Sequence, residues 1–302
     1  MESHPKVSFD NLENSFAFRS DREIQRAYWL FKAISYPALV KVGSNLATAS
    51  LRYHLPVKGL IKATIFKHFC GGEDIHDCAR TIERLGRLGV GSILDYSVEG
   101  KEEEEQFDAV LEKTLKLIEF AKEKKAIPFA VFKPSGFGRI DLYEEVSLGK
   151  KLNLSEFEEW NRVVARFEKV CKASHDSDVA LLIDAEESWM QDAVDNLVEE
   201  MMVKYNKSKP IVFNTLQMYR WDRLDYLKKL HEKAKAEGFF IGMKLVRGAY
   251  MEKENERAIE KGYPTPICAS KEATDENYDA AVKYMVDHLD MMSIFEGTHN
   301  EA

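Results

Sequence analysis

The sequence is poor in several features that define secreted, membrane-spanning and nucleic-acid-binding proteins. It has only four cysteines in 302 residues and no Cys-x-x-Cys pair, so we expect reduced thiols and no disulfide framework. No purely apolar run approaches the roughly 20 residues that a membrane-spanning helix needs. The formal net charge of -8 disfavours a general nucleic-acid binder, because neutralising phosphates requires a basic surface. The N-terminal residues lack the pattern of a secretion or organellar signal, and we therefore place the protein in the cytoplasm.

One cluster suggests a metal site but has the wrong spacing for one. Two His-x-Cys pairs begin at His68 and His76, eight residues apart. This spacing does not match the usual structural zinc patterns, and Gly71-Gly72 between the pairs is typical of a helix end followed by a turn. We therefore expect no metal.

Residues 1–88 are predicted to form a helical N-terminal region. Beyond Ser20, apolar residues recur three to four positions apart, and prolines at positions 37 and 56 punctuate the pattern. Residues 1–19 show no clear period, so we expect a loose arm there.

From residue 89 to residue 302 the pattern changes to short β-like runs separated by helices. Six runs can be distinguished, at residues 92–96, 129–133, 180–184, 211–216, 240–246 and 292–295. Strands that alternate regularly with helices predict a parallel sheet with right-handed crossovers, which is an α/β fold.

The ends of these runs favour a barrel over an open sheet. Each run ends in or near a polar or titratable residue, namely Asp95, Lys133, Asp184, Gln217, Lys244 with Arg247, and His299. In a (β/α) barrel the C-terminal strand ends converge on one mouth, whereas an open sheet uses only one or two of them. No Gly-x-Gly-x-x-Gly loop follows the first run. We therefore predict a (β/α)8 TIM-like barrel of which about six β/α units are present.

The stretch from Gly242 to Met251 is the strongest candidate site. Lys244 interrupts an apolar run, and a buried lysine is costly unless it meets an anion or a ligand. Gly248 would let the backbone approach a bound group closely. The alternative is a surface strand whose basic residues face water.

Other strand ends carry residues suited to catalysis or binding. Asp184 could hold a cationic network or handle a proton, unless it only caps the next helix. Lys133 could bind a carboxylate, balance the charge of a reduced cofactor or form a Schiff base, or it could make a structural ion pair. Gln217 suits a flat heteroaromatic ring such as a flavin, because its amide both donates and accepts. A helix capped near Thr274 could bind phosphate.

Six motifs, in this order, together resemble the proline dehydrogenase family. They are Phe-Lys-Pro-Ser-Gly at 132–136, Ile-Asp-Ala-Glu at 183–186, Leu-Gln-Met-Tyr at 216–219, Lys-Leu-Val-Arg-Gly-Ala-Tyr-Met at 244–251, Lys-x-x-Thr-Asp-x-x-Tyr at 271–278 and Thr-His-Asn at 298–300. The resemblance extends from about residue 91 to the last residue. The fourth motif is closer to single-function and eukaryotic-type members than to bifunctional bacterial ones.

The resemblance implies oxidation of L-proline to 1-pyrroline-5-carboxylate on a distorted (β/α)8 barrel, with FAD as the hydride acceptor. Electrons would pass to a membrane quinone, which admits a peripheral contact with the membrane. Asp184 and Lys244 take catalytic positions, and Lys133 and Tyr250 shape the proline site, with Asp95 and Glu99 at matching acidic positions. The residues implied to contact FAD are Ala185, Gln217, Lys244, Val246, Arg247, Gly248, Ala249, Lys271, Thr274, Thr298, His299 and Asn300.

By the same resemblance, we expect the chain to be incomplete at its C-terminus. The family continues after Thr-His-Asn with a Tyr-x-x-Arg-Arg-x-x-Glu segment, whose arginines clamp the proline carboxylate. Two other functions stay open from the residues. One is a Schiff-base lyase or aldolase that uses Lys133 or Lys244, and the other is an inactive flavin-binding or interaction fragment.

Overall fold

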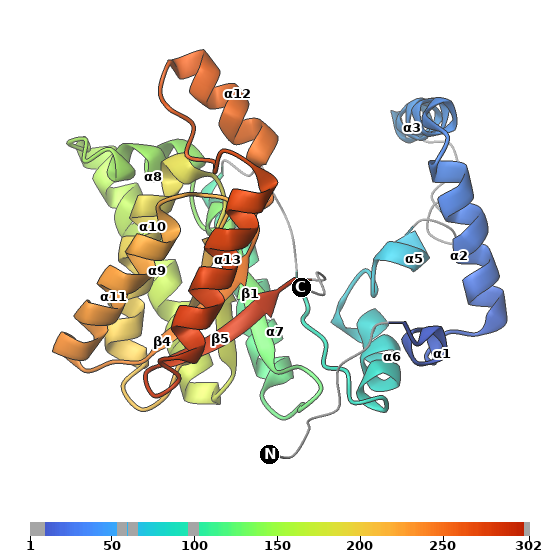
Figure 1. Cartoon of the computed structure of the whole chain (residues 1–302), viewed down its shortest axis with the longest axis horizontal. Helices are drawn as coiled ribbons and strands as arrows, with labels where there is room; N and C mark the ends of the chain where they lie inside the picture. Colours follow the sequence, from blue (N-terminus) through green and yellow to red (C-terminus); the bar gives the residue numbers. More distant parts are fainter. Residues whose placement is uncertain (1–9, 53–58, 60–65, 96–102, 299–302) are drawn as a thin grey trace. The chain divides into compact units, whose positions relative to one another are not determined.

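This computed structural model describes residues 10–52, 59, 66–95 and 103–298 of the 302-residue chain (Figure 1). The chain divides between Gly91 and Ser92 into two compact units, one helical and one built on a parallel sheet. Glu99, His299 and Asn300, three of the predicted site residues, lie outside the described residues. None of the described helices combines the length and the apolar character that crossing a bilayer requires.

The helical unit confirms the predicted helical N-terminal region over its described residues. Its helices are α1 (Leu12–Phe16), α2 (Asp21–Ile34), α3 (Pro37–Arg52), α5 (Lys67–Phe69) and α6 (Ile75–Gly86). The expected loose arm is wrong for residues 12–16. There the Asn11 side chain accepts a hydrogen bond from the Asn14 amide at 3.0 Å and so caps α1.

Within the described residues, the sheet of the second unit has five parallel strands, which lie side by side in chain order. They are β1 (Phe129–Phe132), β2 (Ala180–Ile183), β3 (Val212–Gln217), β4 (Ile241–Val246) and β5 (Met292–Gly297). Five of the six predicted runs are therefore confirmed as strands.

The first predicted run, at 92–96, does not form a strand within the described residues. Leu94 makes a single isolated parallel bridge to Ala130 of β1. The Ser92 amide instead donates to the carbonyl of Ala126, in the loop before β1, at 2.7 Å. Over residues 92–95 the segment therefore pairs with the sheet at one residue, and the prediction of a strand over these residues is wrong.

Helices connect successive strands and cover the sheet (Figure 1). Packing of α7 against β1, of α9 against β2, of α10 against β3 and of α13 against β4 and β5 encloses the core. The elements are α7 (Glu104–Ala121), the short 3-10 helix η2 (Pro134–Gly136), α8 (Ile140–Ser147), α9 (Leu154–Ser177), α10 (Ser188–Tyr205), α11 (Arg223–Glu237), α12 (Met251–Lys261) and α13 (Lys271–Val286).

An aromatic cluster shows that the sheet is curved. Phe129 of β1 contacts Phe213 of β3 and Phe295 of β5, with ring centroids 5.6 Å and 5.1 Å apart. These rings lie beside Val131 and Leu182 on one face of the sheet. Because β1 and β5 are at opposite ends of the strand order, their rings can touch only if the sheet bends toward closure, as in a barrel. The site lies on this inner face.

Candidate active site

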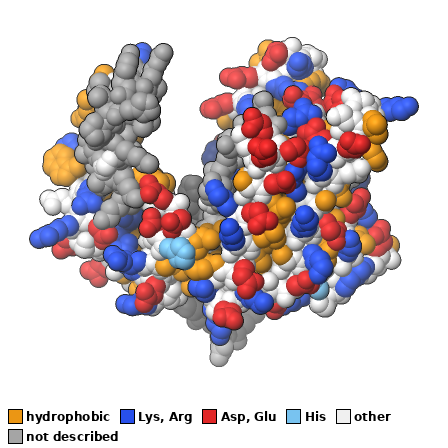
Figure 2. Space-filling view, turned by 180° about the vertical axis from the view of Figure 1, so that it is seen from behind, with side chains coloured by type: hydrophobic (Ala, Val, Ile, Leu, Met, Phe, Trp, Pro, Cys, Tyr) orange, Lys and Arg blue, Asp and Glu red, His pale blue; other side chains and the backbone are white. Residues whose placement is uncertain are grey.

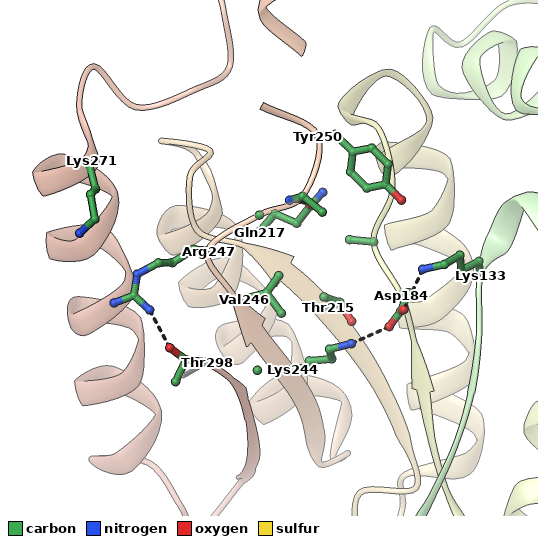
Figure 3. Close-up of a pocket in the computed structure, with 14 residues that line it drawn as sticks. Lys133, Asp184, Thr215, Gln217, Lys244, Val246, Arg247, Tyr250, Lys271 and Thr298 are labelled. Atoms are coloured by element: carbon green, nitrogen blue, oxygen red, sulfur yellow. Dashed lines mark hydrogen bonds and ion pairs between the residues drawn. The ribbon is translucent and has the colours of Figure 1, made fainter. Parts of the chain in front are cut away.

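A pocket of about 610 Å³ lies at the C-terminal ends of the strands (Figure 3). Side chains along a strand point alternately to its two faces, and this alternation decides which residues form the floor of the pocket. Lys133 and Asp184 lie two residues beyond Val131 and Leu182, and therefore on the face that carries the aromatic cluster. The pocket is lined by Lys133, Asp184, Ala185, Thr215, Gln217, Lys244, Val246, Arg247, Gly248, Ala249, Tyr250, Lys271, Gly297 and Thr298.

Asp184 joins two lysines on the floor of this pocket. Its Oδ2 accepts a hydrogen bond from Lys133 Nζ at 3.1 Å, and its Oδ1 accepts one from Lys244 Nζ at 2.7 Å. The side chains of Lys133, Asp184 and Lys244 are only 19%, 14% and 17% exposed. Because two ammonium groups share one carboxylate, the trio favours the approach of a further anion.

Lys133 is a stable positive charge. Burial acts to lower its pKa, but the carboxylates of Asp184, Asp95 and Glu186 outweigh burial and hold the pKa above the ordinary value. A protonated ammonium can hold an anion, whereas Schiff-base formation requires the neutral amine. This positive charge therefore suits Lys133 for binding an anion and disfavours it as a nucleophile.

Glu186 ties together the loops that surround the pocket. Its side chain accepts hydrogen bonds from the amide of Ser135 at 2.8 Å and from the Ser135 hydroxyl at 2.6 Å. Burial raises its pKa to about 7. Its backbone carbonyl accepts a hydrogen bond from Gln217 Nε2 at 2.7 Å, and Gln217 Oε1 accepts one from the Ala249 amide at 3.0 Å. The Gln217 amide thus already has two backbone partners and holds the pocket wall in place.

A second group of charges stands at the other end of the pocket. Arg247 Nε donates to Asp275 at 2.5 Å and Arg247 Nη1 donates to the Thr298 hydroxyl at 2.8 Å. Its guanidinium lies 4.5 Å from the ring centroid of Tyr278, and Lys271 reaches Asp275 at 2.6 Å. This end is more exposed, with Lys271 at 74%, and it could hold the anionic part of a cofactor.

Two glycines, Gly248 and Gly297, form part of the pocket wall between these two ends. Gly248 has φ of 140°, and a Cβ there would lie 2.5 Å from the ring of Tyr219. A Cβ on Gly297 would lie 2.8 Å from Val246 Cγ1. Side chains are therefore disfavoured at both positions, at Gly248 by its backbone conformation and the buried Tyr219 ring and at Gly297 by Val246. The backbone at both glycines can consequently be approached closely by a bound group.

The comparison with sequence families agrees with the motifs. The sequence model described as Proline dehydrogenase matches residues 78–302. The chain belongs to the proline dehydrogenase family. The family resemblance seen in the six motifs is therefore confirmed.

Two curated relatives of this chain have different names, and both are longer than this chain. The chain is 36% identical over 244 residues to the carbapenem antibiotics biosynthesis protein CarD of Pectobacterium carotovorum subsp. carotovorum, which covers 81% of this chain and 64% of CarD. It is 29% identical over 289 residues to proline dehydrogenase 1, mitochondrial, of Dictyostelium discoideum, which covers 82% of this chain and 50% of that protein. The chain thus spans about half to two thirds of the length of these two relatives.

Solved structures of proline utilization A have the same fold. The protein from Bdellovibrio bacteriovorus inactivated by N-propargylglycine matches with a TM-score of 0.69 and 16% identity, covering 95% of this chain and 31% of that one. A Bradyrhizobium japonicum variant matches with a TM-score of 0.61 and 19% identity, covering 76% and 23%. The predicted TIM-like barrel fold of the proline dehydrogenase family is therefore confirmed.

Most of the predicted site residues that the structure describes line the pocket. Asp95 and Thr274 do not. The Asp95 side chain is exposed, although its charge acts on Lys133. Ser270, not Thr274, caps α13, while the Thr274 hydroxyl donates to the Ser270 carbonyl at 3.2 Å and is buried. The expected cap at Thr274 is therefore wrong.

Sequence reasoning missed three residues of the site. Thr215 and Gly297 line the pocket, and Glu186 supports it. Thr215 lies two residues before Gln217 in the same strand, so alternation alone could have placed both on the inner face. No pattern indicated that Glu186 would be buried, because a glutamate just before the start of a helix is more often solvated.

Proposed function

We propose that the protein oxidises L-proline to 1-pyrroline-5-carboxylate, with FAD bound in the pocket as the hydride acceptor. The observation that carries the proposal is the Lys133–Asp184–Lys244 trio, a net-positive and largely buried group at the mouth of a proline dehydrogenase-family barrel. A small amino acid offers a carboxylate to such a group and presents its ring to the open side of the pocket.

The residues present fit FAD. The absence of side chains at Gly248 and Gly297 would let the isoalloxazine ring approach the backbone closely, while Arg247 and Lys271 offer cations to the pyrophosphate. Lys244 lines the same pocket and donates from Nζ to Asp184 at 2.7 Å, so it would lie near the ring. When bound, FAD supplies the two-electron acceptor that proline oxidation needs.

The chain's own residues contribute binding and orientation. Lys133, protonated and held by Asp184, would attract the proline carboxylate, and Tyr250 would close one side of the ring site. Asp184 would also hold the two ammonium groups at fixed positions, so that the substrate meets a preorganised site. In these roles the residues would orient the ring carbon beside the amine toward the hydride acceptor.

The proposal includes a quinone as the next electron acceptor and a cytoplasmic location with a peripheral membrane contact. The quinone and the membrane contact rest on the family resemblance, whereas the location rests on the N-terminal composition. The raised pKa of Lys133 argues against a lyase or aldolase that uses Lys133, since that chemistry needs a neutral amine.

Flavin absorbance tests the proposal directly. After incubation with FAD and removal of unbound cofactor, we expect visible flavin bands that bleach when L-proline is added without oxygen. Mass spectrometry should then detect 1-pyrroline-5-carboxylate, and a short-chain quinone should restore the bands. D-proline and 4-hydroxyproline serve as substrate controls. Protein that retains no FAD, or whose flavin L-proline does not bleach, would contradict the proposal and leave the non-enzymatic alternative.

A pair of lysine variants tests the assigned binding role. Lys133→Met should raise KM for L-proline by about 100-fold, because the carboxylate loses a charge-assisted partner of roughly 3 kcal/mol. Lys204→Met removes a lysine that pairs with Glu168 on the outer helices and should leave KM unchanged. Equal KM values in the two variants would contradict the assignment.

A further inference from the structure

Glu186 lies behind the pocket floor and has no place in the proposed chemistry. It follows Asp184 by two residues, is 4% exposed and does not line the pocket. Burying a carboxylate costs free energy unless hydrogen bonds or opposite charges compensate for it. The contacts of Glu186 show which groups provide this compensation.

The side chain of Glu186 holds the turn that follows Lys133. Both of its oxygens accept hydrogen bonds from Ser135, one from the amide at 2.8 Å and one from the hydroxyl at 2.6 Å. Ser135 belongs to η2, which begins directly after Lys133. In the same turn, the Tyr143 hydroxyl donates to the Pro134 carbonyl at 2.9 Å. The backbone that follows Lys133 is thus held by two side chains, Glu186 and Tyr143.

The backbone of Glu186 extends this support across the pocket. Its amide donates to Gln191 Oε1 at 3.3 Å, and its carbonyl accepts from Gln217 at 2.7 Å. Gln217 in turn holds the Ala249 amide at 3.0 Å. One residue therefore connects the loops after β1, β2 and β4 to the end of β3.

We infer that Glu186 is a positioning residue of the proposed proline oxidation, which sets the place of Lys133 through Ser135 and the charge that Lys133 offers to the substrate carboxylate. This inference rests on the proposed function. Glu186 acts through Ser135 and Lys133 and does not touch the substrate.

The charge of Glu186 gives the inference a pH signature. The charged or titratable groups that face it are Lys133 at the end of β1, Tyr143 on α8 and Glu187 in its own loop. Burial raises its pKa to about 7, so it gains its charge within the pH range of an ordinary assay. When it ionises, a second carboxylate competes with the substrate for Lys133, and substrate binding should weaken.

Glu186→Gln keeps an acceptor and a donor for Ser135 but removes the charge. The ratio of the wild-type KM for L-proline to that of Glu186→Gln should rise by about threefold to tenfold between pH 6 and pH 8, with little change in kcat. Taking the ratio cancels the ionisation of proline itself. Calorimetric binding of tetrahydrofuran-2-carboxylate, in which oxygen replaces the ring nitrogen, should show the same trend without turnover.

Two further variants separate positioning from charge. Glu186→Ala should lower kcat/KM by about 100-fold, because the turn loses both acceptors, and Glu186→Gln should restore most of that loss. Ser135→Ala should raise KM by about threefold to tenfold at all pH values. Glu168→Gln, which alters a carboxylate between the outer helices α9 and α10, should match the wild type.

The outcomes distinguish the inference from the function on which it rests. A constant KM ratio across pH, or Ser135→Ala with unchanged KM, would overturn the inference while proline turnover by the wild type still supports the proposed function. A wild type that does not oxidise proline would overturn both. If Glu186→Ala does not fold, Glu186→Gln and Ser135→Ala decide the result.

Discussion

The two ends of the pocket hold their charges in opposite ways. At the Asp184 end (Lys133, Asp184 and Lys244), no side chain is more than 19% exposed. At the Arg247 end (Arg247, Lys271, Asp275 and Thr298), Arg247 is 25% exposed and Lys271 is 74% exposed. Because water and salt screen exposed charges, the second end attracts anions but fixes them weakly, whereas the first end sets a geometry. We therefore expect the chemistry at the Asp184 end and the cofactor anchor at the Arg247 end.

Replacing the central carboxylate at each end should show the largest difference between them. Asp184→Ala should lower the free energy of unfolding by about 4 kcal/mol, because two largely buried lysines would be left without their anion. Asp275→Ala, at the exposed end, should lower it by at most about 1 kcal/mol. Urea denaturation measures both values. Equal losses in the two variants would remove the distinction between the ends.

The pH dependence of stability should sharpen the contrast at the buried end. Burial raises the pKa of Glu186 from 4.5 to about 7. Its neutral form is therefore favoured in the folded state, and the stability that the raised pKa contributes is fully present below pH 4.5 and lost as pH rises through 7. Relative to Glu186→Gln, the wild type should lose about 3 kcal/mol of unfolding free energy across this window. Parallel curves for the two proteins in urea at several pH values would contradict this prediction.

Adding a methyl group at Gly248, in the wall between the two ends of the pocket, should lower both stability and FAD affinity. Gly248→Ala should cost about 2 kcal/mol, because φ of 140° strains any other residue and the Cβ would meet Tyr219. Gly262→Ala is the matched control. Its φ is 72° with open space around the Cβ, so it should cost only about 1 kcal/mol and leave FAD binding unchanged. Thermal unfolding and FAD titration compare the two, and the same FAD affinity in both would contradict the role of the wall.

The smallest stability effect should come from the exposed end. Arg247→Ala should change the free energy of unfolding by less than about 1 kcal/mol but weaken FAD binding about tenfold. Raising the salt concentration should weaken FAD binding to the wild type more than to the variant, since screening acts on the charge that the variant lacks. Lys271→Ala should show the same trend to a lesser degree. FAD affinity that does not respond to salt in any of the three proteins would mean that charge does not anchor the cofactor.

The sequence predicted five strands and their parallel order but not how far the first run would pair with the sheet. Alternation and apolar runs placed β1 to β5 to within about two residues, since these patterns depend on local burial. The run at 92–96 is also apolar in part, yet among its described residues, 92–95, only Leu94 bridges to the sheet. A local pattern cannot tell whether a neighbouring strand is close enough to complete the ladder.

In the site, too, some features could be predicted from the sequence and others depended on tertiary contacts. Polar residues at successive strand ends predicted a shared mouth, and the Lys133, Asp184 and Lys244 side chains do meet there. Nothing in the sequence indicated that Glu186 would turn inward to hold Ser135. Likewise, the pattern pointed to Thr274 as a cap, but Ser270 takes that role because α13 begins at Lys271.

Residue order alone thus determined that parallel strands would bring certain polar side chains to one edge of the sheet, because side-chain alternation and chain direction are local properties. Only the tertiary structure decided that Asp184 would serve two lysines and that Glu186 would be buried behind them. These contacts depend on the curvature that brings Phe129 of β1 against Phe295 of β5. Curvature arises from the packing of all the strands and helices together, so no single stretch of sequence records it.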